Sequence, residues 1–454
     1  METMIAENVE ILAGWGNYPT VESTVVKPRN ENEVREAIAK KQIVPRGLGR
    51  SYGDQAINKN SNVAVCTRMN HFISFDETNG ILECEAGTSL ADIISAFAPR
   101  GYLPMICPGT KYVTIGGAIA NDIHGKAHHI DGSFVNCVVS FQIMLADGRI
   151  LTASREENSD LFWANFGGLG LLGIILSAKI KLRKVQSTYF KQKSLVVKNL
   201  DEMLDALEIY DKDYNYSVAW VDPLAKGKKL GGGVLTLGNA AEISDLPDSL
   251  KLNPLKVSGD PKISVPVFFP DFALNSVTVQ VLNKVIAFVQ NSSKTIVHYE
   301  KFFFPLDAIN NWNRGYGKRG FVQYQFVIPL EKGRENLRVI LEKIARSGCN
   351  PFLNVLKKMG PGQGILSFPF EGYTLAIDFP VTKNLIPFTK DLDKTVLDAG
   401  GRLYLGKDAL LDKDMFRAMY PQYKEWMGVK AKYDPDNVFT SNIGRRLGLE
   451  VGSL

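Results

Sequence analysis

The sequence predicts an α+β protein of more than one domain, whose second half is built on an antiparallel sheet with helices on one face. A chain of 454 residues is too long for one ordinary core, so at least two domains are expected. Up to about residue 183, short strand and helix patterns alternate with glycine-rich loops. Residues 185–400 then mix strands with long amphipathic helices, which favours helices packed on one face of an antiparallel sheet.

The elements of the first half follow from periodicity and from capping residues. In the predicted helix 31–41, Val34, Ala37 and Ile38 share one face. Ser89 and Gly101 bracket a second helix as N-cap and C-terminal glycine. Asp147-Gly148 marks a hairpin turn. Strands are expected at 42–47, 62–69, 81–87 and 173–182.

The second half gives clear strands and two long helices. Leu337, Ile340, Leu341 and Ile344 form one apolar face of a helix over 335–348. A second helix is expected over 388–401, where it ends in a glycine pair. The stretch 225–265, rich in Gly, Lys, Pro and Asp, is expected to be a mobile loop. Strands are expected at 188–197, 217–222, 321–329 and 373–380.

Composition excludes several classes of protein. A net charge of +5 is too small for a nucleic-acid-binding surface on a chain of this length. The five cysteines have no disulfide or CxxC spacing. No run of about 20 apolar residues suggests a membrane span, and the most apolar segment, 264–290, is interrupted by polar residues and prolines, which favours a core segment. Without a recognisable signal peptide, the expected location is the cytoplasm or the periphery of the inner membrane.

One glycine motif is misleading. Residues 168–173 read GLGLLG and match the dinucleotide fingerprint GxGxxG. That fingerprint requires a strand before it and a helix after it, whereas here a helix precedes and a strand follows. The segment is therefore interpreted as a turn between a helix and a strand.

Two other glycine-rich loops carry more information. The loops 45–55 (PRGLGRSYGDQ) and 108–125 (PGTKYVTIGGAIANDIHG) each place several glycines after a strand or helix end. Glycine allows backbone N–H groups to converge on an anion, so the two loops could hold one pyrophosphate from both sides. Two ordinary tight turns explain the same residues equally well.

Taken together, the motifs resemble the vanillyl-alcohol-oxidase, or PCMH-type, FAD-binding family. The resemblance rests on PRGLGRSYGD, VTIGGAIANDIHG, ADGRI and DLFWANFGGLGLLGII, and it continues through WNRGYG, FLNVLKKMG and GGRLYLGKD. It covers most of the chain, with a poor match over 225–300. Within the family the chain is most similar to the branch that oxidises a polyprenyl-phosphoryl ribose at its 2-hydroxyl.

The resemblance implies a two-domain α+β, PCMH-type fold with an antiparallel-sheet cap. The implied FAD-binding domain is 1–185, the substrate or cap domain is 186–404, and 405–454 returns to the FAD domain. The residues implied to line FAD are Pro45, Arg46, Gly47, Leu48, Gly49, Arg50, Ser51, Tyr52, Gly53, Asp54, Gly109, Thr114, Ile115, Gly116, Gly117, Asn121, Asp122, Ile123, His124, Gly173, Ile174 and Tyr404.

The mode of FAD attachment follows from the first loop. Many family members tether FAD through a histidine there, but this chain reads RSYGD, with Tyr52 and without histidine or cysteine. Non-covalent FAD is therefore expected, and His124 in the second loop is the weaker candidate for a tether.

Oxidation of an alcohol by a flavin requires a proton acceptor, a cation near the flavin and groups that orient the sugar. Lys407, beside Tyr404, is the first candidate for the base or the cation; the alternative is a surface lysine paired with Asp408. His124 is a candidate to hydrogen-bond the sugar, and Tyr52 to face it across the flavin plane.

The substrate candidates lie in the second half and in the second glycine loop. Gln323 and Gln325 are two apart on an apolar strand and share one face, which indicates sugar recognition or a hydrated edge. Lys357 and Lys126 are candidates to hold a phosphate, or are solvated lysines. Trp220 stacks on a sugar or fills the core.

Two further features bear on the substrate and on metals. His124, His128 and His129 form HxxxHH without an acidic or cysteine ligand at a helpful spacing, so no metal is expected. Relatives carry Asn and Cys where Thr374 and Ala376 stand, and Tyr-His where Phe303-Phe304 stand. These changes make the site less polar. The Phe302–Phe304 run suits a lipid tail or the core.

Three functional hypotheses remain from the sequence. The first is the oxidase of an epimerisation on a polyprenyl-phosphoryl pentose, acting with a separate NAD(P)H-dependent reductase and with dioxygen or a quinone as electron acceptor. The second is an aldonolactone or alditol oxidase acting on a soluble sugar. The third is a flavin-binding homologue without turnover; Lys407, His124 and Gln325 argue against it.

Overall fold

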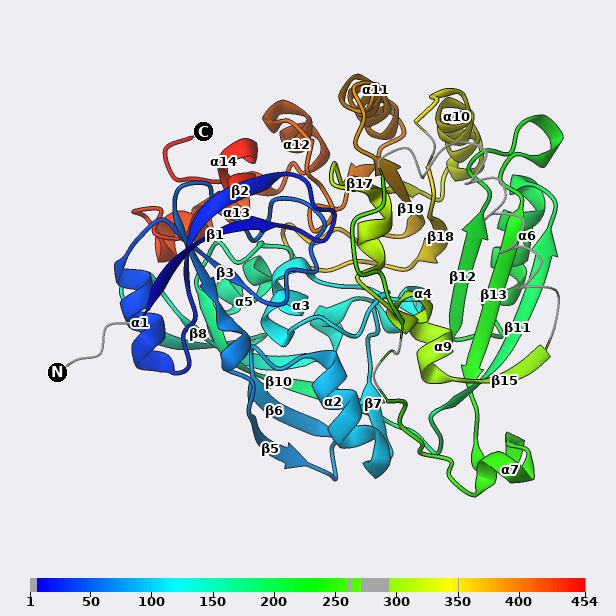
Figure 1. Cartoon of the computed structure of the whole chain (residues 1–454), viewed down its shortest axis with the longest axis horizontal. Helices are drawn as coiled ribbons and strands as arrows, with labels where there is room; N and C mark the ends of the chain where they lie inside the picture. The colour runs from blue at the N-terminus through cyan, green and yellow to red at the C-terminus, as the bar shows by residue number, and fades with distance from the viewer. Residues whose placement is uncertain (1–5, 260, 262, 271–293, 350, 454) are drawn as a thin grey trace.

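The computed structural model describes residues 6–259, 261, 263–270, 294–349 and 351–453 (Figure 1). Most of the apolar segment 264–290 therefore lies outside the described residues. Within the described part of the chain, no helix is both long and apolar enough to cross a membrane.

The first half of the chain forms two sheets. One has the order β1-β2-β4-β3, with β2 and β3 parallel to β4; the other is antiparallel, in the order β5-β6-β10-β8-β9, with β7 also paired to β10. The strands are β1 (Glu7–Ala13), β2 (Thr20–Val26), β3 (Ile43–Arg46), β4 (Asn62–Val65), β5 (Phe72–Asp76), β6 (Ile81–Glu85), β7 (Tyr102–Pro104), β8 (Val138–Met144), β9 (Ile150–Ser154) and β10 (Ile174–Lys184).

Helices α1 and α2 of this half begin at the residues that the sequence indicates. The Ser89 side chain accepts a hydrogen bond from the Asp92 N–H at the start of α2, and Gly101 adopts a left-handed conformation shortly after its end. The motif GLGLLG follows helix α5 and precedes strand β10, so it lacks the strand-before, helix-after context that a Rossmann dinucleotide site requires. The helices are α1 (Glu31–Ala39), α2 (Leu90–Phe97), α3 (Ile115–Asn121), α4 (His128–Asp131) and α5 (Ser159–Asn165).

The second half forms an eight-stranded antiparallel sheet in the order β15-β11-β13-β12-β18-β19-β17-β20. Helices α6 (Leu200–Tyr210), α10 (Gly333–Arg346) and α11 (Leu385–Asp398) pack on one face, as expected. The strands are β11 (Tyr189–Val197), β12 (Tyr216–Val221), β13 (Gly233–Ala240), β15 (Lys294–His298), β17 (Phe321–Pro329), β18 (Asn354–Met359), β19 (Gly372–Pro380) and β20 (Arg402–Leu403).

The expectation of a mobile loop over 225–265 is wrong for part of that stretch. Residues 233–240 form β13, which pairs with β11 on one side and β12 on the other. Val234, Leu235 and Leu237 are buried there. The surrounding glycines and lysines conceal this short apolar pattern, and cross-strand packing on both sides outweighs the composition. The rest holds a short helix, α7 (Asp248–Lys251), and β14 (Ile263–Ser264), which pairs with β16 (Ile309–Asn310).

The last fifty residues pack against the first half of the chain. The Trp426 indole donates to the Ala164 carbonyl at 2.9 Å. The buried Lys430 ammonium donates to the Leu171 carbonyl at 2.6 Å and pairs with Asp434 at 2.5 Å. These contacts hold the C-terminal segment against α5 and the GLGLLG turn. Its helices are α12 (Lys413–Met419), α13 (Tyr423–Tyr433) and α14 (Asn442–Leu447); α9 (Tyr299–Phe303) lies earlier, beside β11.

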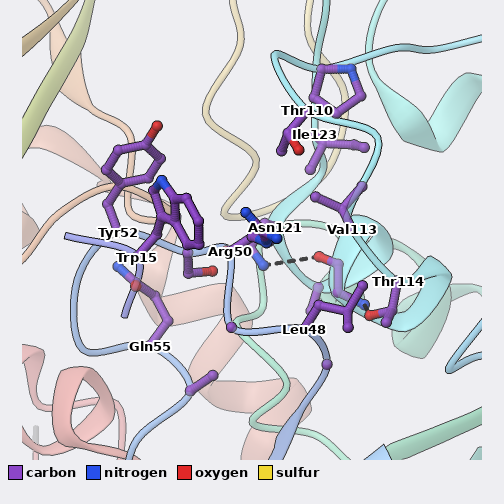
Figure 2. A pocket seen from close by; sticks show the side chains of 18 of the residues that line it. Trp15, Leu48, Arg50, Tyr52, Gln55, Thr110, Val113, Thr114, Asn121 and Ile123 are labelled. Atoms are coloured by element: carbon purple, nitrogen blue, oxygen red, sulfur yellow. Dashed lines mark hydrogen bonds between the residues drawn. The ribbon is translucent and has the colours of Figure 1, made fainter. Parts of the chain in front are cut away.

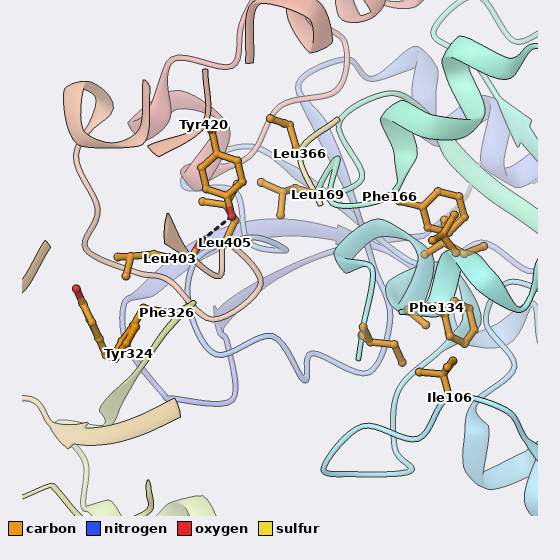
Figure 3. Packing of buried hydrophobic residues seen from close by; sticks show 14 of the residues in the cluster. Ile106, Phe134, Phe166, Leu169, Tyr324, Phe326, Leu366, Leu403, Leu405 and Tyr420 are labelled. Carbon is orange, nitrogen blue, oxygen red and sulfur yellow. Dashed lines mark hydrogen bonds between the residues drawn. The ribbon is translucent and has the colours of Figure 1, made fainter. Parts of the chain in front are cut away.

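One large apolar cluster joins the two halves (Figure 3). Phe134 and Phe166 come from the first half, whereas Tyr324 and Phe326 come from β17. Tyr420 of the C-terminal segment belongs to the same cluster, and its hydroxyl donates to the Leu403 carbonyl at 2.6 Å. The sheet is thereby fixed against the loops of the first half.

Candidate active site

A cavity of about 300 Å³ lies between the two glycine-rich loops and the face of the sheet opposite to α6, α10 and α11. The first half contributes loop residues such as those in Figure 2. The second half contributes side chains from β17, β18 and β19, together with the turn that follows β20. The cavity therefore has a loop wall and a sheet wall.

The loop wall is held together by backbone contacts. At Gly47, which follows β3, a β-carbon would lie 2.1 Å from the Thr114 hydroxyl, so only glycine allows the two loops to meet. Thr114 caps α3 by accepting from the Gly117 N–H at 3.2 Å. The Asn121 amide donates to the Gly117 carbonyl at 2.9 Å (Figure 2).

Most of the predicted site residues line this cavity. They are Pro45, Arg46, Gly47, Leu48, Gly49, Arg50, Ser51, Tyr52, Gly109, Thr114, Gly116, Gly117, Asn121, Ile123, His124, Gly173, Ile174, Gln323, Gln325, Lys357, Tyr404 and Lys407. Residues more than 350 positions apart thus meet at one site.

Six of the predicted residues do not line it, each for a visible reason. Gly53 packs against the Asp408 backbone. Asp54 pairs with Arg446 at 2.7 Å. Ile115 is in the core. Asp122 ends α3 and accepts from the Ser133 hydroxyl at 2.7 Å and the Val135 N–H at 3.0 Å. Lys126 and Trp220 are the other two.

The Lys126 ammonium donates to the Phe302 carbonyl, and its Nζ lies 4.7 Å from the Phe302 ring centroid. Burial, and then Lys357, lower its pKa to about 7. Trp220 is opposite Val355 in the sheet, half-buried, and its indole N–H has no partner among the described residues. A contact of either side chain with a ligand remains a prediction.

The histidines of the HxxxHH motif have different hydrogen-bond partners. The His128 ring accepts from the Gly360 N–H at 3.1 Å, and the His129 ring lies 3.1 Å from the Tyr214 carbonyl. Phe303 and Phe304 belong to a buried aromatic cluster with Phe190, so the core alternative describes them.

At one end of the sheet wall, the Lys407 Nζ lies 3.8 Å from the centre of the Tyr52 ring. Burial lowers the Lys407 pKa to about 7; Asp378 opposes this shift and Lys357 adds to it. Burial alone lowers the Lys357 pKa to about 8. Such lysines exist in part as neutral amines near pH 7, which makes them suitable proton acceptors.

A buried carboxyl that the sequence interpretation missed stands behind this lysine. Asp378 on β19 accepts from the Gln323 amide at 2.6 Å and from the Tyr316 hydroxyl at 3.1 Å. Burial raises its pKa to about 7. Period-two alternation could have found it, because Thr374, Ala376 and Asp378 share one face of the strand.

His124 contacts the neighbouring glutamine. Its Nε2 lies 2.9 Å from the Gln325 amide nitrogen, which also donates to the Thr374 hydroxyl at 3.2 Å. Burial, and then Lys357, His128 and Lys407, lower the His124 pKa well below its usual range. The imidazole is therefore neutral. Ala376, the other departure from the family pattern, lines the cavity opposite Gln325.

Beside Tyr52 the cavity also includes Trp15, Asp307 and Trp312, none of which was among the predicted site residues. The Arg50 guanidinium lies 3.9 Å from the Trp15 ring centroid, and Figure 2 shows the two side chains together. They reach the cavity from three separate segments, so neither spacing nor periodicity identifies them.

The residues present fit an FAD molecule. Around the cavity, Arg50 Nε, Gln55 Oε1 and Asn121 Oδ1 are buried without a hydrogen-bond partner among the described residues. A β-carbon on Gly109 would meet no protein atom within 4 Å, so this backbone borders open space. Unpaired polar atoms beside an open backbone surface suit a polar ligand that supplies the missing partners.

Two family models match the chain: an FAD binding domain over residues 23–154 and a D-arabinono-1,4-lactone oxidase domain over residues 318–447. A decaprenylphosphoryl-beta-D-ribose oxidase from Mycolicibacterium smegmatis is 38% identical over 452 residues, covering 96% of this chain and 97% of the relative. The chain belongs to the PCMH-type FAD-dependent oxidoreductases.

Other members of the family are more distant. An L-gulono-1,4-lactone dehydrogenase from Mycobacterium tuberculosis is 20% identical over 455 residues, covering 95% of this chain and 98% of the relative. A carbohydrate oxidase from Microdochium nivale is 27% identical over 219 residues, 44% of each chain. The FAD cofactor, the α+β fold and the oxidoreductase class expected from the sequence are thus confirmed.

Proposed function

We propose that this enzyme oxidises the 2-hydroxyl of a polyprenyl-phosphoryl pentose to a ketone. The main support is the near-full-length relative, which acts, by its name, on decaprenylphosphoryl-beta-D-ribose. The half-buried lysines of the sheet wall also support a phosphorylated substrate. Lys357 lines the cavity without an ion pair to any described residue, so an incoming phosphate would compensate its charge.

Bound FAD supplies a hydride acceptor for the carbon that carries the hydroxyl. Lys407 takes the hydroxyl proton at Nζ, since burial keeps part of this lysine neutral near pH 7. Tyr52, whose ring lies under that ammonium, limits where Nζ can reach. Gln323 and Gln325 orient the sugar, and Trp15 and Trp312 exclude water from the part of the cavity beside Tyr52.

The domain division proposed is 1–185 for FAD, 186–404 for the substrate and 405–454 returning to the FAD domain. The course of the sheets supports it: β10 ends at Lys184 and the eight-stranded sheet starts with β11 at Tyr189. Non-covalent FAD is proposed because the first loop offers no histidine or cysteine.

The partners proposed are a separate NAD(P)H-dependent short-chain reductase, which restores the hydroxyl with opposite configuration, and dioxygen or a quinone as acceptor. Peripheral membrane contact is proposed with them, since a polyprenyl chain partitions into a bilayer. The exposed side chains of Ile263, Val267 and Phe269 suit such a contact.

The test is anaerobic addition of polyprenyl-phosphoryl ribose to the purified yellow protein. Bleaching of the flavin absorbance, with one keto-sugar formed per flavin, is the expected result. A yellow protein that this substrate does not bleach, but that an aldonolactone or alditol does, would overturn the proposal. The aldonolactone or alditol oxidase is kept as the second candidate because the D-arabinono-1,4-lactone oxidase model matches residues 318–447, a weaker support than the near-full-length relative.

A further inference from the structure

Two glutamines on the sheet wall are held in fixed orientations by groups behind them. Gln323 and Gln325 both line the cavity from β17. An amide side chain presents either a carbonyl acceptor or an N–H donor, depending on which way it is turned. The hydrogen bonds of these two residues determine that choice.

For Gln325 the amide nitrogen is fully used. Its two N–H groups point to His124 Nε2 at 2.9 Å and to the Thr374 hydroxyl at 3.2 Å. The Thr374 hydroxyl already donates to the Phe326 carbonyl at 2.8 Å, so it can only accept from Gln325. Turning the amide round would set two acceptors against each other. The Gln325 carbonyl oxygen therefore faces the cavity.

For Gln323 a carboxyl decides the orientation. Its amide nitrogen lies 2.6 Å from Asp378 Oδ1, and the Tyr316 hydroxyl donates to the other carboxyl oxygen at 3.1 Å. Asp378 is opposite Gln323 in the sheet and completely buried. The nitrogen of Gln323 is thus held toward Asp378, which leaves its carbonyl oxygen toward Tyr52, its other side-chain partner, and with a second lone pair for a donor in the cavity.

We propose that His124 and Asp378 are positioning residues that make both glutamines present carbonyl acceptors, and that these acceptors recognise two hydroxyls on adjacent carbons of the substrate. Residues two apart on a strand are separated by about 6.5–7 Å. Two acceptors at that spacing, each about 2.8 Å from its donor, leave room between them for one pair of neighbouring hydroxyls.

This inference rests on the proposed function, because it assumes a sugar in the cavity. It assigns His124 a different task from a catalytic one. Its Nε2 accepts from Gln325, and its Nδ1 is buried without a partner among the described residues. The lowered pKa of His124 agrees with a neutral ring that accepts at Nε2. His124 then acts on the sugar through Gln325.

The test compares wild-type enzyme, Gln323→Leu and Gln325→Leu on prenyl-phosphoryl ribose and on its 3-deoxy analogue, following anaerobic flavin bleaching. In the wild type, loss of the 3-hydroxyl should raise the half-saturating concentration about tenfold, the loss expected for one buried acceptor without its donor. In one of the two variants the same loss should have almost no effect. If removal of the 3-hydroxyl raises the half-saturating concentration equally in all three proteins, the inference is overturned.

The positioning role has its own double-mutant test. His124→Phe should raise the half-saturating concentration as much as Gln325→Leu does, and the double variant should be no worse than either single one. His129→Phe in the neighbouring helix α4 is the matched control, since its ring contacts the Tyr214 carbonyl. Additive effects of His124→Phe and Gln325→Leu would overturn the positioning role.

The failure of the proposed function gives a different signature. If prenyl-phosphoryl ribose does not bleach the flavin of the wild-type enzyme, both the proposed substrate and the diol inference are wrong. If the substrate bleaches the wild-type flavin but removal of the 3-hydroxyl has the same effect in both variants as in the wild type, only the diol inference is wrong.

Discussion

The two walls of the cavity are built in different ways. The loop wall consists mainly of backbone, and a glycine at position 47 permits the two loops to approach. The sheet wall consists of long polar side chains on β17, β18 and β19, held by buried partners such as Asp378. Substitutions on the loop wall should therefore affect FAD binding, and substitutions on the sheet wall should affect turnover.

The largest effect is expected at Lys407. Lys407→Met removes the proton acceptor and should lower the rate of anaerobic flavin bleaching by about 10²–10⁴-fold, the usual contribution of a general base. FAD content should not change, because the lysine belongs to the sheet wall. The absorbance spectrum measures the FAD content, and stopped-flow absorbance measures the rate of bleaching. Loss of FAD from this variant would contradict the division between the walls.

A smaller effect is expected on the loop wall at Gly109. Gly109 lines the cavity and a β-carbon there would meet no protein atom within 4 Å, so Gly109→Val should lower FAD affinity about tenfold or more, given the usual cost of overpacking of about 1–3 kcal/mol. Gly428→Val, whose β-carbon also meets nothing within 4 Å, is the control. Fluorescence titration of the two apoproteins with FAD compares their affinities, and equal affinities would contradict the prediction.

The smallest effect is a shift of the pH profile. Lys407 must be neutral to accept a proton, so bleaching should rise with pH through the pKa of this lysine, about 7. The Asp378 carboxylate raises that pKa, whereas burial and Lys357 lower it. Asp378→Asn should therefore move the rising limb to lower pH, by about one unit or less. A shift to higher pH would contradict this assignment.

The same difference explains what the sequence could predict. Glycine loops are recognisable by composition and spacing, and the family resemblance that they carry implied that residues 45–52, Thr114, Gly116 and Gly117 line FAD; all of them line the cavity. Gln323 and Gln325 followed from the period of a strand. The partners behind them, His124 for Gln325 and Asp378 for Gln323, depend on cross-strand register and on loops 200 residues away, which one sequence does not contain.

The strand β13 shows the same limit within the fold. Its apolar residues lie in a glycine- and lysine-rich stretch that local pattern assigns to a loop, but two neighbouring strands recruit it into the middle of the sheet. Tertiary pairing decided the outcome there, as it did for Trp15 and Trp312 at the cavity.

The contacts of the C-terminal segment have a consequence for biosynthesis. In strand β3, which leads into the first glycine loop, the Ile43 N–H donates to the Val438 carbonyl at 2.8 Å, and the Lys430 ammonium donates to the Leu171 carbonyl. Tyr404 and Lys407 complete the cavity itself. On the ribosome, the cavity therefore cannot be complete before this C-terminal segment has been synthesised and has packed against the first half of the chain.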